Sequence, residues 1–147
     1  NKNAEISSKL YGWRKYSKDF QRTYRKISNL DDMHENGAHD YLKFIKFGYG
    51  RGTDHSTKDI RLGYMSREEG IEMVKKYDHI RPTDDLSRWF SYTNISEDKF
   101  NKYSDKFRDP RVWYIKNNQW FKENSWGGQG SYGEVFLESK DKDKYYR

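Results

Sequence analysis

The sequence predicts a mainly α-helical fold, an orthogonal bundle of about five short helices with a small C-terminal β-hairpin. Two observations carry this prediction. Between residues 34 and 109, apolar residues recur at helical spacing in short runs, each bounded by capping residues, glycine or proline. Beyond Asp109-Pro110, two short aromatic segments flank Asn117-Asn118, a pattern typical of a hairpin.

The first part of the chain is predicted from its hydropathy. Residues 2–16 look helical, whereas residues 17–33 are polar and basic without a period, as expected for a linker. The next segment carries the stripe of an amphipathic helix, with apolar side chains at Ala38, Tyr41, Leu42 and Ile45. Three alternating glycines then interrupt it, at Gly48, Gly50 and Gly52.

Four further helices are predicted from residues that typically start or end a helix. Thr53 is expected to cap a helix that runs to about Leu62, with Gly63 just beyond it. Ser66 opens a capping box for the next helix, and Pro82 and Ser96 start the last two. The inward positions predicted for these three are Ile71, Val74, Tyr77, Leu86, Trp89, Phe90, Thr93, Phe100, Tyr103 and Phe107.

The last part of the chain is predicted to hold little regular structure beyond the hairpin. Residues 111–115 and 119–121 are its expected strands, glycines at 127–133 suggest a flexible stretch, and residues 138–147 form a charged tail. The chain thus divides into a basic lead-in over 1–30, a helical domain over 31–109, and a hairpin with a flexible tail over 110–147.

Composition narrows the function classes. The net charge is +6, but residues 1–30 hold eight basic and two acidic side chains, while the remainder is balanced. A protein-wide nucleic-acid surface is therefore not expected. The absence of cysteine excludes disulfides and thiolate metal sites. With no apolar run as long as a membrane span, we expect a cytoplasmic protein with no membrane partner.

The segment 46–61, called the glycine segment below, is the strongest functional candidate. Gly48, Gly50 and Gly52 lead into an expected helix start at Thr53, and basic residues flank the segment. A helix N-terminus opened by glycines suits an anion. Arg51 and Arg61 can pair with a phosphate or carboxylate, and Asp54 can accept from a hydroxyl or amine.

A structural alternative stays open for this segment. Glycine also serves a tight helix–helix turn that needs positive φ, with solvated charges around it. The expected helix face is small and mostly polar, where a helix that packs only for stability normally carries larger apolar residues. Its residues are Thr53, Ser56, Thr57 and Ile60. This composition favours a ligand that approaches the backbone closely.

The other motifs of the sequence are weaker evidence for a function. The histidines (His34, His39, His55 and His79) lack metal-ligand spacing, although His55 lies in the glycine segment and acid–base work stays open for it. Residues 128–135 match the kinase glycine-loop pattern without the rest of a kinase. The tryptophans at 113, 120 and 126 can stack on bases or sugars, but packing of the hairpin on the helices explains them more simply.

Five stretches of the sequence, taken together in order and spacing, resemble a known family. They are residues 44–54, 60–61, 66–70, 74–78 and 105–109. Together they resemble the C-terminal part of the N-acetyl sugar amidotransferases of bacterial surface-polysaccharide biosynthesis, and the resemblance covers most of residues 1–126. Residue 52 is glycine where that family's pattern leads us to expect alanine.

The resemblance implies an enzyme of the PP-loop ATP pyrophosphatase type. Such an enzyme binds ATP with Mg²⁺, adenylates the acetamido oxygen of a nucleotide-linked N-acetyl sugar, and uses ammonia from a glutaminase partner to make an acetamidino group. The sugars enter lipopolysaccharide O-antigen or flagellar glycans. The family's Ser-Gly-Gly-x-Asp-Ser loop is absent from residues 1–147, so we expect a piece of a longer enzyme, inactive alone, whose residues 1–30 include the end of the nucleotide domain.

By matching position, the resemblance implies a substrate side formed by Arg51, Thr53, Asp54 and Arg61 with Gly48, Gly50 and Gly52. Two alternatives remain. One is a non-catalytic basic helical module that contacts nucleic acid through residues 9–26. The other is a docking surface for the nucleotide domain or the glutaminase.

Overall fold

A computed structural model of the chain describes residues 2–27 and 35–146. Among these residues it has six α-helices and a three-stranded antiparallel sheet, so the mainly helical fold with a C-terminal hairpin is confirmed. The helices are α1 (Lys2–Tyr11), α2 (Glu35–Phe47), α3 (Arg51–Arg61), α4 (Arg67–Tyr77), α5 (Thr83–Thr93) and α6 (Glu97–Asp105). The strands are β1 (Trp113–Lys116), β2 (Gln119–Glu123) and β3 (Gln129–Glu134). No helix in the described part is long and apolar enough to cross a membrane.

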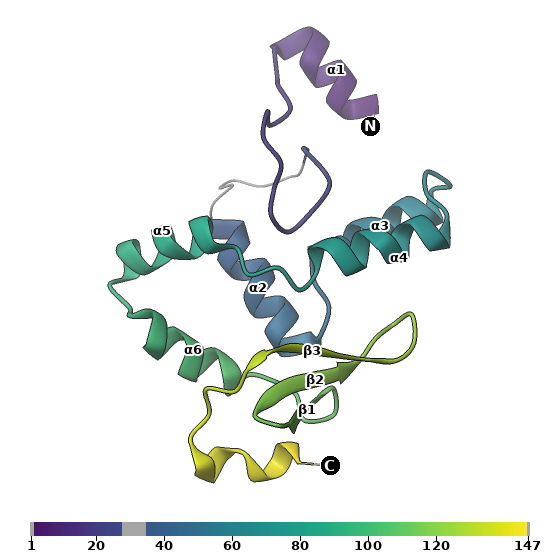
Figure 1. Ribbon diagram of the computed structural model, residues 1–147. Helices are drawn as coiled ribbons and strands as arrows, with labels where there is room; N and C mark the ends of the chain where they lie inside the picture. The colour runs from purple at the N-terminus through teal and green to yellow at the C-terminus, as the bar shows by residue number, and fades with distance from the viewer. Residues whose placement is uncertain (1, 28–34, 147) are drawn as a thin grey trace.

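Helix α2 lies at the centre of the molecule (Figure 1). The antiparallel pair α3 and α4 lies to one side of it, and α5 and α6 lie to the other. The sheet lies beside the C-terminal end of α2, while α1 stands apart from the rest. The loop that leaves the C-terminal end of α2 leads into α3, and at Gly48 it lies close to Val112 and to Lys122 of the sheet.

Two hydrophobic clusters hold these parts together. Ala38 of α2, Leu86 of α5 and Phe100 of α6 form the first, as the helical stripes predict. Phe44, six residues further along α2, enters the second cluster. That cluster joins the sheet to the C-terminal segment through Trp113, Ile115, Trp120, Val135, Leu137 and Tyr145. Burying such large side chains stabilises a domain that has few aliphatic residues.

The boundaries of α4, α5 and α6 follow their predicted caps. Ser66 and Glu69 form both halves of the capping box, and Ser96 accepts a hydrogen bond from the backbone of Lys99. Of the inward positions predicted for α6, Phe100 is confirmed, whereas Tyr103 and Phe107 are wrong because both are more than half exposed. The other buried residues of α6 are Ser104 and Asp105.

Helix α3 begins earlier than predicted. Its N-cap is Gly50, so Thr53 lies inside the first turn and is not the cap. The predicted end is correct: Gly63 has φ +72°, and its N–H donates to the carbonyl of Ile60.

The hairpin turn is confirmed, and the rest of the C-terminal region is more ordered than predicted. Asn117 and Asn118 both have positive φ, as a two-residue turn requires. Residues 129–134, predicted as flexible, form β3 and pair with β2. The expected tail folds into two short 3-10 turns, η1 (Ser139–Asp141) and η2 (Asp143–Tyr145), and Tyr145 is only 1% exposed.

The N-terminal lead-in contains two kinds of structure. Helix α1 ends at Tyr11, earlier than predicted, and exposes Ile6 and Leu10. The segment 17–27, predicted as a linker, instead buries Arg22 and Thr23 in the body of the domain. The remaining linker residues and His34 lie outside the described residues.

Candidate functional site

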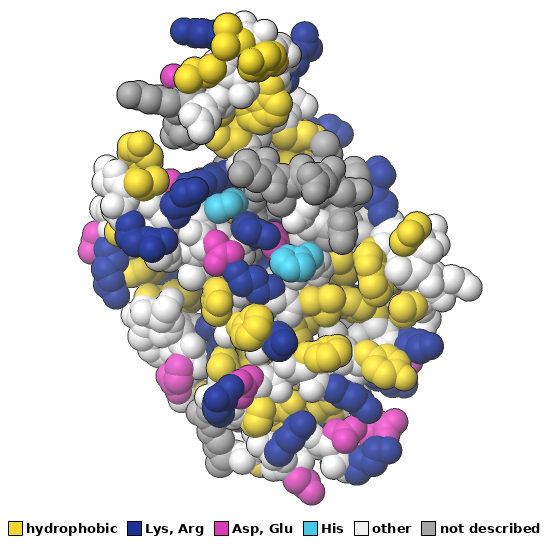
Figure 2. Space-filling model, turned by 180° about the vertical axis from the view of Figure 1, so that it is seen from behind, with side chains coloured by type: hydrophobic (Ala, Val, Ile, Leu, Met, Phe, Trp, Pro, Cys, Tyr) yellow, Lys and Arg dark blue, Asp and Glu magenta, His cyan; other side chains and the backbone are white. Residues whose placement is uncertain are grey.

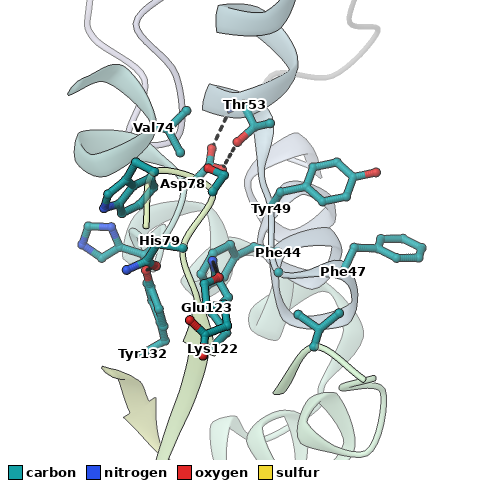
Figure 3. A pocket seen from close by; sticks show the side chains of 15 residues that line it. Phe44, Phe47, Tyr49, Thr53, Val74, Asp78, His79, Lys122, Glu123 and Tyr132 are labelled. Atoms are coloured by element: carbon teal, nitrogen blue, oxygen red, sulfur yellow. Dashed lines mark hydrogen bonds between the residues drawn. The ribbon is translucent and has the colours of Figure 1, made fainter. Parts of the chain in front are cut away.

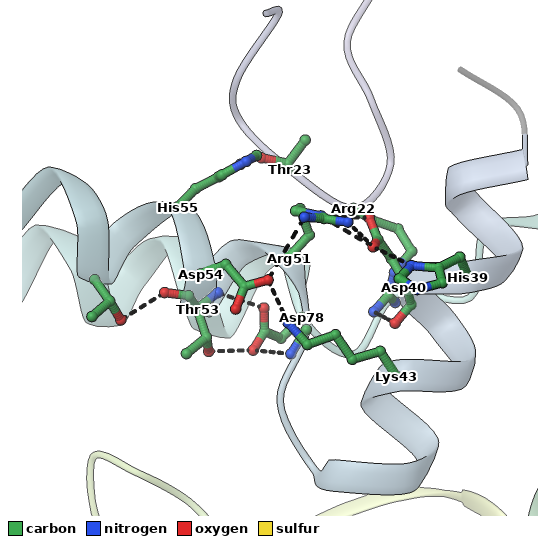
Figure 4. A network of polar contacts seen from close by, with 12 residues as sticks. Arg22, Thr23, His39, Asp40, Lys43, Arg51, Thr53, Asp54, His55 and Asp78 are labelled. Atoms are coloured by element: carbon green, nitrogen blue, oxygen red, sulfur yellow. Dashed lines mark hydrogen bonds and ion pairs between the residues drawn. The ribbon is translucent and has the colours of Figure 1, made fainter. Parts of the chain in front are cut away.

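The N-terminus of α3 is closed by a carboxylate of the protein itself. Asp78, at the C-terminal end of α4, is 4% exposed and accepts hydrogen bonds from Gly50 N at 2.8 Å and Thr53 N at 2.9 Å. The hydroxyl of Thr53 donates to the same carboxylate (Figure 4). The anion that the helix start favours is therefore already present as Asp78.

The glycines of this segment make room for charged side chains. Gly48 has φ +76°, and a Cβ there would lie 2.7 Å from Val112 Cγ1 and 3.2 Å from Lys122 Cδ. A Cβ at Gly52, which is helical, would lie 2.7 Å from Asp78 Oδ1. The positive φ of a tight turn therefore explains the glycine at position 48. The close approach of Lys122 to Gly48 and of Asp78 to Gly52 is an additional reason for glycine at these two positions.

The charged candidates do not lie together around one ligand site. Arg51 binds Asp40 through Nε at 3.0 Å and Nη2 at 2.7 Å, and Asp54 pairs with Lys43 (Figure 4). Arg61 is exposed and lies at the opposite end of α3, about 15 Å along the axis from the helix start at 1.5 Å per residue. Arg51, Thr53 and Asp54 thus share one helix end, and Arg61 does not.

The small polar face of α3 is a helix–helix contact over part of its length. A Cβ on Gly70 of α4 would lie 2.7 Å from Ile60 Cδ1 and 3.5 Å from Ser56 Cβ. Ser56 is 2% exposed. Small residues on both helices let their axes come close, so Ser56 and Ile60 serve packing rather than a ligand.

His55 is buried and held by the N-terminal segment. Its Nδ1 is hydrogen-bonded to Thr23 Oγ1 at 2.6 Å. Burial, and then the charges of Arg25 and Arg51, lower the pKa of His55 to about 4, so the ring is neutral at pH 7. Among residues 2–27 and 35–146, no group of three His, Asp or Glu side chains is placed to hold a metal ion.

A cavity of about 460 Å³ opens between the glycine segment and the sheet (Figure 3). Gly48, Tyr49 and Thr53 line it on the helical side, and Trp126 and Tyr132 line it on the side of β2 and β3. Most of its lining is apolar, and its volume is typical of small-molecule sites. We call it the Lys122 cavity, because Lys122 supplies its buried cation.

Lys122 lies on the inward face of β2, two residues after Trp120, and is 6% exposed. In Figure 3 its side chain points from the strand toward Asp78 and the start of α3. Its Nζ lies 5.0 Å from the centre of the Tyr132 ring and 6.0 Å from that of Trp126. Burial lowers the pKa of Lys122, and Asp78 and Glu123 oppose that shift.

The family of the chain follows from comparison with family models. Residues 11–125 match the model of the C-terminal domain of LPS biosynthesis proteins of the WbpG-like type. The chain belongs to this family. None of the curated proteins compared with the chain matches it significantly. The matched region of this WbpG-like C-terminal domain includes the glycine segment, Asp78 and Lys122, and ends just before Trp126.

The basic residues of the N-terminal segment are partly neutralised in this WbpG-like domain. Arg22 is buried, and its guanidinium donates to the carbonyls of Ile80 and Asp40. Arg25 pairs with Asp59, and Lys26 with Asp19. Figure 2 shows basic side chains spread over one face with acidic ones among them. This arrangement gives little support to nucleic-acid binding through residues 9–26.

Sequence reasoning missed the two charged residues that organise the site. Asp78 meets the glycine segment from 25 to 28 residues away in sequence, and a lone aspartate at a helix end carries no signal of such a contact. For Lys122 a signal exists: Trp120 and Lys122 alternate on one face of a strand, which places a lysine inward. The predicted strand ends at residue 121 and so does not include Lys122.

Proposed function

We propose that this chain forms the substrate-binding region of an ATP-dependent N-acetyl sugar amidotransferase of LPS biosynthesis. The carbonyl oxygen of the sugar's acetamido group attacks the α-phosphorus of ATP, and pyrophosphate leaves. Ammonia then adds to the activated carbon, AMP leaves with the oxygen, and an acetamidino group remains. Glutaminase supplies the ammonia, and the reaction takes place in the cytoplasm.

The Lys122 cavity is the observation that supports this proposal best. It combines a size suitable for a sugar or nucleotide with mostly apolar walls and one buried cation. Gly48 and Thr53 line it directly. Membership of an LPS biosynthesis family supports a sugar substrate independently of the cavity.

The other predicted substrate-side residues have a positioning role in this proposal. Arg51 and Asp54 hold the first turn of α3 against α2 through Asp40 and Lys43, and Gly50 and Gly52 seat Asp78. Arg61, at the far end of α3, contacts substrate only if a neighbouring domain brings it there. ATP and Mg²⁺ bind mainly to residues outside 1–147.

The test is product analysis with the full-length protein as it is expressed in the cell. The protein is incubated with a nucleotide-linked N-acetyl sugar, ATP, Mg²⁺ and ¹⁵N-labelled ammonium. We expect AMP, pyrophosphate and a sugar in which one acetamido oxygen has been replaced by ¹⁵N, detected by mass spectrometry. Unlabelled sugar from a protein that still binds it would refute the reaction.

Two variants test the role of the glycine segment in that reaction. Arg51→Ala and Asp54→Ala loosen the start of α3, and displacement of a bound substrate by about 1 Å lowers turnover by about 100-fold. Asp98→Ala, in an exposed ion pair on α6, is the matched control and keeps full turnover. Wild-type kinetics in both α3 variants would remove this segment from the mechanism.

A further inference from the structure

Lys122 has hydrogen-bonding capacity that the described protein does not use. Its ammonium has three N–H donors, and within residues 2–27 and 35–146 its one hydrogen bond goes to the carbonyl of Glu123, at 3.1 Å. No described carboxylate is ion-paired with it. A buried lysine without a carboxylate partner is costly, so this arrangement needs a reason other than stability.

The two acids in the wall of the cavity do not provide that partner. The oxygens of Asp78 accept from Gly50 and Thr53 of the α3 turn. Glu123 Oε1 accepts from Gln129 Nε2 at 2.9 Å, on the exposed side of β2 and β3. The ammonium of Lys122 thus keeps its remaining donors for the cavity.

The surroundings of Lys122 limit the kind of anion that fits. Trp126 and Tyr132 bring aromatic rings to the same cavity, beside the Lys122 ammonium. Aromatic faces stack on the flat or apolar faces of bases and sugars, while a lysine binds phosphate as a point charge. At about 460 Å³, the cavity is larger than an inorganic ion needs.

We propose that the Lys122 cavity binds a phosphorylated ring, with the phosphoryl group at the Lys122 ammonium and the ring against the aromatic walls. The ring comes from a nucleotide or from a sugar phosphate. The inference rests on the proposed function only in placing the substrate in this cavity, and it assigns the anion to Lys122 instead of to the N-terminus of α3, which Asp78 occupies.

Calorimetric binding to the whole protein tests the proposal. The probes are uridine monophosphate, N-acetylglucosamine phosphate, inorganic phosphate and uridine. We expect at least one phosphorylated ring to bind more tightly than both inorganic phosphate and uridine, and the tighter of the two names the source of the ring. Absence of binding for both phosphorylated rings, or equal binding of inorganic phosphate, would overturn the proposal.

Lys122→Met tests the residue while keeping its apolar stem. Loss of a charge-assisted hydrogen bond weakens binding of the phosphorylated ring by about 10- to 100-fold. Lys116→Met is the matched control, because Lys116 also lies over an aromatic ring at a strand end but is exposed and outside the cavity. Unchanged binding in a folded Lys122→Met protein would refute the assignment.

Trp126→Leu tests the aromatic wall and replaces the lysine variant if that protein does not fold. It should weaken the phosphorylated ring by about 10-fold and leave inorganic phosphate unaffected. Equal binding of the ring ligand by wild type and Trp126→Leu would overturn the proposal. Because calorimetry measures binding without turnover, the two proposals can fail separately. If a phosphorylated ring binds in a Lys122-dependent way but no amidine forms, only the proposed reaction is refuted.

Discussion

Arg108 and Lys122 are two buried cations of the same domain, and they differ in whether a carboxylate pairs with them. Arg108 lies between the rings of Trp113 and Trp120, 4.2 and 4.6 Å from their centres, and its Nε donates to Asp105 at 2.9 Å. Lys122 also lies near two rings, and each of the two cations lines a cavity, but no described carboxylate pairs with Lys122. A paired buried cation organises the fold, whereas an unpaired one beside a cavity is available to a ligand.

The Arg108 cluster joins three parts of the chain. Asp105 of α6 accepts from Trp120 Nε1 at 2.9 Å and from the backbone of Phe136 at 2.8 Å. The hydroxyl of Tyr145 donates to the carbonyl of Arg108 at 2.7 Å. The cluster thereby connects the last helix, the sheet and the C-terminal segment, and both oxygens of Asp105 are used within it.

The largest predicted effect is loss of Asp105. Asp105→Ala leaves the Arg108 charge buried without its partner and removes the acceptor of Trp120, so the free energy of unfolding falls by about 3–5 kcal/mol. Urea denaturation followed by far-UV circular dichroism measures it. Lys102→Ala, in an exposed ion pair on the same helix, is the control and costs less than about 0.5 kcal/mol. Equal losses in both proteins would show that the Arg108 cluster is not structural.

Loss of Asp78 should have the next largest effect. Asp78→Ala leaves the N–H groups of Gly50 and Thr53 without acceptors and removes a carboxylate beside buried Arg22. We expect a loss of about 2–3 kcal/mol in the free energy of unfolding. Amide hydrogen exchange locates the effect, because protection should fall first in α3. Unchanged exchange in α3 would contradict the role of Asp78 as its cap.

The features of this fold that the sequence predicts are those formed by residues close together along the chain. The boundaries of α4 and α5 were predictable because Ser66, Glu69 and Pro82 act within their own helices. Strand β3 was not predicted, because its glycines favour loops and its stability comes from pairing with β2. The burial of Tyr145 depends on Trp120, 25 residues earlier, whose ring centre lies 4.8 Å away.

The same reasoning applies to the site. The glycine segment was identified from its composition, and Gly48 and Thr53 do line the cavity. The side chains that approach these glycines closely, Asp78 and Lys122, lie on other elements. Local sequence patterns predict where the chain turns, but only the tertiary structure shows that Asp78 and Lys122 lie beside this turn.

The pH dependence of stability distinguishes a buried neutral group from the two cations. Because the pKa of His55 is lowered to about 4 from 6.5, protonation favours the unfolded chain. His55 therefore costs nothing above pH 6.5, and stability falls as the pH drops from 6.5 toward 4. The expected loss is about 2 kcal/mol, less than the full shift because the ring is partly screened by solvent.

Urea denaturation at pH 7 and pH 5 measures the larger part of this loss, with His55→Asn as the matched variant. An amide can keep the hydrogen bond to Thr23 but does not titrate in this range. The variant should therefore lose less stability between the two pH values than the wild type. His79, whose pKa is also lowered by burial, still titrates in both proteins, so a residual dependence is expected. Identical pH profiles would place His55 in contact with solvent.

The smallest effect on stability, and the sharpest test of the comparison, belongs to Lys122→Met. Removing Arg108's partner should destabilise the protein by about 3–5 kcal/mol. Removing the Lys122 charge instead relieves a buried ammonium that lacks a described carboxylate partner. We expect the free energy of unfolding to stay constant or rise by about 1 kcal/mol. A gain in stability combined with a loss of ligand binding is the signature of a residue retained for function. A loss of more than about 2 kcal/mol would instead make Lys122 a second structural cation, paired at longer range with Asp78.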